Sequence, residues 1–214
     1  MLFSGPLEIG DDMPGDVAPV ADEREGLTGY LNQVRYVLRL SAFGLSDGQA
    51  RVRPTPSGLS ISGIIKHVAA VEGYWMDLVE QRPIAGSAEE YESGFVPDVD
   101  ETLDALLERY ADAAQRTDAV IAAVTDLGQA VPVPHDVPWF PKDVDAWSVR
   151  WVLLHLIEET ARHAGHADIV REAVDGATAF PLMAAAEKWE PTPWMQPWKP
   201  NSSGEAVRSG SMSQ

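Results

Sequence analysis

The sequence predicts an all-α protein, a four-helix bundle followed by an extended C-terminal arm rich in proline and tryptophan. Four segments repeat apolar residues at steps of three and four, which is the period of an amphipathic helix. No alternating pattern of the kind that predicts a strand competes with them. A chain of 214 residues can enclose a full hydrophobic core, so four such helices pack most economically as one bundle.

We expect three regions along the chain. Residues 1–21 mix glycine, proline and acidic residues and predict a mobile arm, and residues 22–190 form the bundle. A short helical stretch, residues 181–190, leads into residues 191–214, where four prolines predict an extended path before a disordered tail. Three indoles lie near this arm, at Trp189, Trp194 and Trp198. They either anchor it on the bundle or cap a pocket or a dimer mate.

The first half of the bundle contains two of the predicted helices. The first spans residues 22–46 and the second spans residues 60–81, with Asp22 and Ser60 as their N-caps. Residues 46–58 contain two prolines in alternation, which predicts an extended connection.

The second half contains the other two. Residues 84–99 are predicted to form a loop, and residues 100–126 return to the helical period. Residues 127–146 contain four prolines and no period, so this long connection is a candidate functional loop. The fourth helix spans residues 147–175 and ends at Gly176.

Charge and cysteine content exclude several classes of protein. The chain has 33 acidic and 16 basic residues, a net charge of −17, which disfavours binding to nucleic acids and to anionic membranes. It has no cysteine, so disulfides and thiolate metal sites are excluded. No signal peptide and no apolar run of about 18 residues is present. We therefore expect a soluble cytoplasmic protein.

The fourth helix carries a cluster of polar residues on one face. With His155 at zero, Glu159, His163 and His166 fall at about 40°, 80° and 20° around the helix axis. His155 and His163 are roughly 12 Å apart along the axis, too far to share an ion. Glu159 with His163, or His163 with His166, are close enough to share one.

A third ligand is available in the second helix, where His67 lies at the edge of the apolar stripe. Together with Glu159 and His163 it predicts a two-histidine, one-carboxylate site with open positions. Such a site suits zinc, iron(II), nickel or manganese. As alternatives to a metal site, His67 could be a hydrogen-bonded histidine of the core, and Glu159 and His163 could form an ordinary pair on the helix surface. His135, in the proline-rich loop, is predicted to face solvent.

Two motifs resemble the DinB/YfiT-like superfamily, especially its actinobacterial branch that includes the mini-circle protein. They are Lys66-His67-Val68 with Glu72-Gly73-Tyr74-Trp75, and the stretch from Trp151 to Asp168. The resemblance covers about residues 22–200 and implies an up-down-down-up four-helix bundle, often dimeric, with a divalent metal at one end. Carried over by position, the implied ligands are His67, Glu159 and His163. Glu159 replaces the commoner third histidine, as in the similar mycothiol-dependent maleylpyruvate isomerase.

The resemblance implies a metal-dependent S-transferase or isomerase that uses a low-molecular-weight thiol such as mycothiol on a small electrophile. Zinc is the first metal expected, with nickel, iron and manganese as alternatives. Since the chain has no cysteine, the thiolate must come from a bound molecule. Glu158 and Arg162 would orient the ligands. Cations that could face the thiolate are Arg150, Arg162, Arg82 and Arg35.

Two other functions remain open at this point. The same three ligands could serve iron(II) and oxygen chemistry, as in the similar bundle of sulfoxide synthases. Alternatively, the chain is a non-catalytic metal-binding stress or binding protein, in which His166 or His155 closes the coordination sphere. The sequence identifies no catalytic residue beyond the ligands, and the resemblance allows a homodimer.

Overall fold

The computed structural model describes residues 16–83 and 94–200. Most of the predicted N-terminal arm, part of the predicted 84–99 loop and the predicted disordered tail after residue 200 lie outside the described residues. Residues 16–22 precede the first helix without regular secondary structure.

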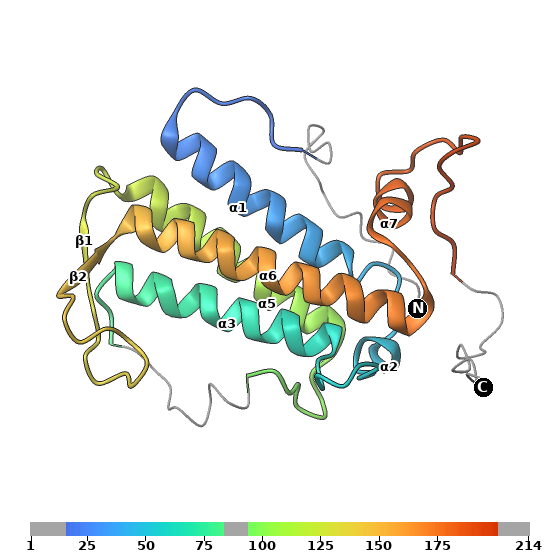
Figure 1. The fold of residues 1–214 in the computed structure, drawn as a ribbon, viewed down its shortest axis with the longest axis horizontal. Coiled ribbons are helices and arrows are strands. Elements are labelled where there is room, and N and C mark those ends of the chain that lie inside the picture. Colours follow the sequence, from blue (N-terminus) through green and yellow to red (C-terminus); the bar gives the residue numbers. More distant parts are fainter. Residues whose placement is uncertain (1–15, 84–93, 201–214) are drawn as a thin grey trace, which may run out of the picture.

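Four long helices form the bundle that the sequence predicts (Figure 1). They are α1 (Glu23–Leu40), α3 (Ile61–Val79), α5 (Leu103–Ala123) and α6 (Val149–Asp175). α1 and α6 run in one direction, and α3 and α5 run in the other, which is the up-down-down-up arrangement. α6 packs against α1 and α3, and α3 also packs against α5. α3 and α6 are therefore antiparallel neighbours.

Side-chain caps explain where these helices begin. Asp22 accepts hydrogen bonds from the backbone N–H groups of Arg24 and Glu25, and Ser60 accepts one from that of Gly63. Ser148 caps α6 in the same way. α6 ends at Gly176, whose φ of 79° is the left-handed conformation that glycine adopts without strain.

The core follows the apolar stripes of the helices. One cluster lies around Ile64, Ile65 and Leu106, and a second lies around Trp75 and Val152. All five side chains are at most 3% exposed, so their burial is the main stabilising contribution of the bundle. None of the helices in the described ranges is long and apolar enough to cross a membrane.

Three short elements correct the sequence-based prediction. The connection predicted to be extended contains α2 (Asp47–Ala50). A capping box formed by Ser46 and Gln49 stabilises this short helix, which ends before the prolines. The proline-rich connection contains β1 (Ala130–Pro132), which pairs antiparallel with β2 (Ala146–Ser148). α6 consequently starts at Val149 instead of residue 147. Strands of three residues are too short to show an alternating period.

The C-terminal arm lies against one end of the bundle. After α7 (Ala179–Ala186), Trp189 and Trp198 pack against a cluster that includes Tyr36 and Leu182. The indole of Trp198 also lies over Gly44, where any Cβ would overlap it. Two of the three indoles therefore anchor the arm, whereas Trp194 is 77% exposed.

Candidate metal centre

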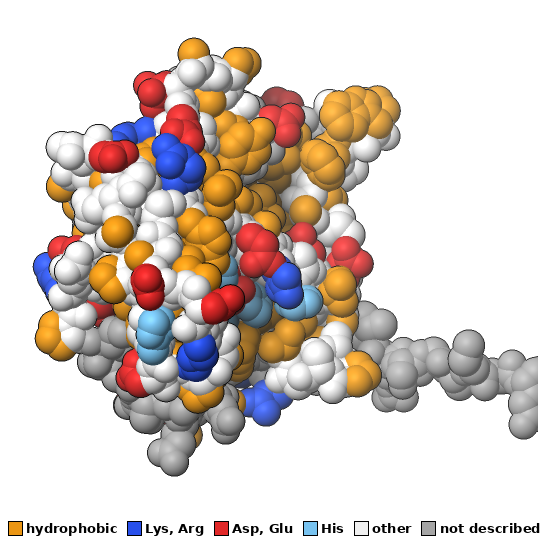
Figure 2. All heavy atoms as spheres, turned by 60° about the vertical axis from the view of Figure 1, so that its left-hand side comes forward, with side chains coloured by type: hydrophobic (Ala, Val, Ile, Leu, Met, Phe, Trp, Pro, Cys, Tyr) orange, Lys and Arg blue, Asp and Glu red, His pale blue; other side chains and the backbone are white. Residues whose placement is uncertain are grey.

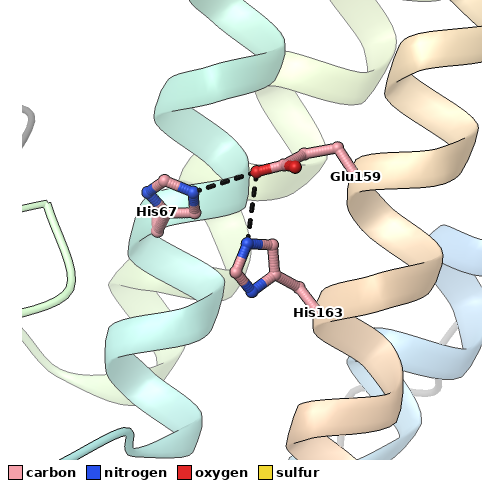
Figure 3. A group of neighbouring side chains, drawn as sticks. All are labelled: His67, Glu159 and His163. Atoms are coloured by element: carbon pink, nitrogen blue, oxygen red, sulfur yellow. Dashed lines mark hydrogen bonds and ion pairs between the residues drawn. The ribbon is translucent and has the colours of Figure 1, made fainter.

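His67, Glu159 and His163 lie together between α3 and α6. Each offers one ligand atom, and these atoms are all within 4.8 Å of one another. Nε2 of His67 and Nε2 of His163 are each 3.2 Å from the same carboxylate oxygen, Oε1 of Glu159 (Figure 3). His67 and His163 are 2% and 8% exposed, and the side chain of Glu159 is 18% exposed. Glu159 and His163 are one helical turn apart on α6, whereas His67 is 92 positions before Glu159 in the chain. The antiparallel packing of α3 on α6 therefore brings His67 to the other two.

The arrangement fits a divalent metal ion. Two ligands that each lie about 2.1 Å from one ion at a tetrahedral angle are roughly 3.4 Å apart, close to the observed nitrogen–oxygen separations. Two imidazoles and a carboxylate suit zinc, iron(II), nickel and manganese. Nδ1 of His163 is buried and has no hydrogen-bond partner among the described residues. The ring of His163 is therefore oriented by packing, and not by the usual carboxylate or carbonyl acceptor.

Hydrogen bonding with the two histidines keeps Glu159 ionised. Its contacts with His163 and His67 hold the pKa of the carboxyl well below its ordinary value, although burial opposes this. An ionised carboxylate and neutral imidazoles are the forms that ligate metals. The carboxylate of Glu159 is thus in the form that binds a cation.

Phe95 covers one side of this cluster. Its ring stacks on the imidazole of His67 with centroids 3.9 Å apart and an interplanar angle of 17°. It also approaches the ring of His163, with centroids 5.4 Å apart. The two imidazoles contact each other edge to face at 4.9 Å. Packing of Phe95 therefore contributes to fixing the plane of His67 and covers one face of its ring.

The segment that carries Phe95 is held against α3 by several contacts. At Gly63, one turn before His67, a Cβ would overlap the carbonyl oxygen of Phe95, so only glycine permits this approach. Lys66 forms ion pairs with Asp98 and Glu101 at 2.9 and 2.8 Å. Burial alone would raise the pKa of Glu101, but Lys66, the Asp98 backbone N–H and Arg109 together lower it to about 2.

Replacing Phe95 with alanine should weaken metal binding about tenfold, since partners that fix a ligand's orientation typically contribute that much. The measurement is competition with a chromophoric chelator, and the cobalt(II) spectrum reports the ligand geometry. Phe180→Ala is the control, because it removes a phenyl ring that is 63% exposed elsewhere. Equal affinities of the two variants and the wild type would show that Phe95 does not position His67.

An aromatic stack lies beside the cluster along α6. Trp147 stacks on Trp151 with centroids 4.9 Å apart and planes 9° apart, and Trp151 stacks on His155 at 5.2 Å and 5°. Trp75 of α3 meets both Trp151 and His155. The stacked residues are spaced four apart, and Glu159 is the next in the series. The stack therefore ends one helical turn before a candidate ligand.

The other residues predicted near the site take different positions. The ring of His166 is 5.5 Å from that of His163 and is exposed, and His155 belongs to the aromatic stack. Arg162 donates a hydrogen bond to Glu158, so these two contact each other on the exposed face of α6. His135 is exposed, as predicted, and its Nε2 lies 3.1 Å from the carbonyl oxygen of Val144.

All four arginines proposed to face a thiolate form ion pairs. Arg35 is buried and paired with Glu72 and Asp118, and Arg82 is paired with Glu80. Arg150 is paired with Glu23 and Arg162 with Glu158. Within the described residues, each of the four therefore already has its charge compensated.

Sequence reasoning missed Phe95 and the aromatic stack. The signal for the stack was present, because the positions of Trp147, Trp151 and His155 continue the four-residue spacing of Glu159 and His163. No local signal exists for Phe95, which is 28 residues from the histidine it covers and reaches it only through tertiary packing.

Comparison with known proteins agrees with this fold. One solved structure, a conserved protein from Enterococcus faecalis, is similar with a TM-score of 0.58 and 14% identity, over 74% of this chain and all of that one. This likeness shows the fold. No curated protein sequence matches. The family model for mycothiol S-transferases matches residues 26–176, which include all three candidate ligands and most of the bundle. The chain belongs to the mycothiol S-transferase family, a branch of the DinB/YfiT-like superfamily.

Proposed function

We propose that this protein is a metal-dependent S-transferase that joins mycothiol, or a similar small thiol, to a small electrophile. Family membership implies a transferase enzyme. The observation that carries the metal part is the convergence of His67, Glu159 and His163 within 4.8 Å. We assign these three residues as the ligands, with zinc as the first metal to test and nickel, iron(II) and manganese as alternatives.

The residues of the chain have distinct tasks in this proposal. A bound divalent ion supplies Lewis acidity that lowers the pKa of a thiol. Glu159 contributes the negative charge that offsets part of the charge of the ion, and Phe95 keeps His67 in a fixed plane. The chain has no cysteine, so the attacking sulfur belongs to the substrate. The new bond joins that sulfur to the electrophile, and its proton and the leaving group go to solvent.

The positions of two histidines favour an open catalytic site over a closed structural one. A non-catalytic site needs a fourth protein ligand, for which His166 and His155 are the candidates on α6. The ring of His166 is exposed, and the ring of His155 stacks on Trp151 and meets Trp75 at an interplanar angle of 63°. With three ligands from the described residues, positions on the ion remain for a thiol. We further propose that the bundle, residues 22–190, is the functional unit and works in the cytoplasm as a homodimer, which sedimentation velocity tests.

The experiment combines metal analysis with a thiol-transfer assay. Protein purified without chelator should contain close to one equivalent of metal and should alkylate mycothiol with a haloalkane, and chelation should remove the activity. Replacement of mycothiol by glutathione tests the thiol. Metal content below half an equivalent after addition of each of the four metals, or equal rates before and after chelation, would contradict the proposal.

A further inference from the structure

The aromatic stack formed by Trp147 of β2 with Trp151 and His155 of α6 is partly open to solvent. Trp151 is 39% exposed, and its neighbours Trp147 and His155 are half-buried. Figure 2 shows hydrophobic side chains along the middle of one face of the molecule, with histidine, acidic and basic side chains beside them. The stack therefore offers aromatic surface to a ligand on the same helix as two candidate metal ligands.

The stack has a defined end. Its planes differ by only 5° to 9°, so Trp147, Trp151 and His155 form a nearly parallel series. Glu159 holds the next position in the four-residue series, but its carboxylate turns toward His67 and His163 (Figure 3). A planar ring that continued the stack beyond His155 would lie beside that carboxylate.

The charges around His155 indicate which net charge a bound aromatic ligand should have. Glu158 and Glu159 are acidic, and Arg162 is already paired with Glu158. Burial lowers the pKa of His155, so its imidazole is neutral at neutral pH and adds no positive charge. A bound ion would neutralise Glu159, and Arg162 is paired with Glu158, so the surface of the stack is apolar and neither residue offers an anionic ligand a free positive charge.

We propose that Trp151 and His155 form the binding site for the electrophile, and that this electrophile carries an uncharged aromatic ring. Stacking on His155 holds the ring one helical turn from Glu159, next to the metal centre. The identity of the reaction rests on the proposed function, whereas the binding step does not. Trp151 acts through the stack by supporting His155, and His155 contacts the substrate.

The first test measures binding without reaction. Benzyl alcohol and its saturated counterpart cyclohexylmethanol have the same size, but only the first has a planar ring. By calorimetry or NMR titration, wild type should prefer benzyl alcohol about five- to tenfold, the range expected for an aromatic stacking contact. Trp151→Ala and His155→Ala should lose the preference, and His155→Phe should keep it. Trp194→Ala, which removes an indole that is 77% exposed elsewhere, should change nothing.

The second test measures the reaction with benzyl bromide and allyl bromide. The ratio of their kcat/KM values should fall in Trp151→Ala and His155→Ala, through a higher KM for benzyl bromide. The different intrinsic reactivities of the two bromides cancel when the ratio in a variant is compared with the ratio in the wild type. The bromides cannot alkylate a protein thiol, because the chain has no cysteine. Equal binding of the two alcohols by the wild type, or an unchanged preference in Trp151→Ala, would overturn the inference. Ring preference without any thiol transfer would contradict the proposed function alone.

Discussion

Replacing His163 with alanine should abolish metal binding and lower the rate of thiol transfer about a hundredfold or more. His163 is 8% exposed and is one of the three candidate ligands among the described residues, so its loss leaves two donors there, His67 and Glu159. Removal of the imidazole also takes away the contact that helps to keep the Glu159 carboxyl ionised. Metal content by mass spectrometry and the rate of mycothiol alkylation are the two measurements.

His166→Ala is the matched control for this variant. His166 lies on the same helix three residues later, and its ring is exposed. This control should retain its metal and at least half of its activity. Far-UV circular dichroism verifies that both variants are folded. If His163→Ala retained a full equivalent of metal, the three-residue site would be wrong, and loss of metal in His166→Ala would make His166 a fourth ligand.

Replacing Arg171 with leucine should lower the free energy of unfolding by about 3–5 kcal/mol, the typical result of breaking a buried charge pair. The side chain of Arg171 is 1% exposed and forms two hydrogen bonds of 3.0 Å with Asp175. It also donates to the carbonyl oxygens of Ser41 and Phe43, and lies 5.0 Å from the ring centre of Trp198. Leucine would leave the carboxylate and both carbonyl groups without these donors. Urea denaturation gives the free energy.

Arg162→Leu provides the matched comparison, because Arg162 forms an ion pair of the same four-residue spacing on the same helix. Its pair with Glu158 has side chains that are 63% and 48% exposed, so the loss should be below about 1 kcal/mol. Trp198→Ala should fall between the two variants. Similar unfolding free energies for Arg171→Leu and Arg162→Leu would show that burial of Arg171 does not contribute as we expect.

The bundle could be predicted because helical information is local. Asp22 and Ser60 were identified as N-caps from residue type and position alone, and both accept the expected backbone hydrogen bonds. Gly176 likewise ends α6. The errors occur where fewer residues contribute to a pattern. α2 has four residues, although Ser46 and Gln49 carry the spacing of a capping box, and β1 and β2 have three residues each.

The candidate ligands were predictable for a different reason. Glu159 and His163 are one turn apart, so helix geometry alone brings them together. The choice of His67 needed the resemblance as well, because a single histidine at the edge of an apolar stripe is usually a core residue. The structure places its Nε2 3.2 Å from Glu159. The prediction that Glu158 and Arg162 orient the ligands could not be made reliably from the sequence, because these two residues form a hydrogen bond with each other.

The sequence by itself determined the four helices, the absence of a protein thiol and the pair of candidate ligands on α6, because each depends on composition or on contacts within one helix. The tertiary structure decided the rest. Only the packing of α3 on α6 brings His67 to Glu159, and only the close approach permitted by Gly63 places Phe95 on His67. Contacts between residues distant in the chain depend on the sum of many packing interactions, which no local pattern encodes.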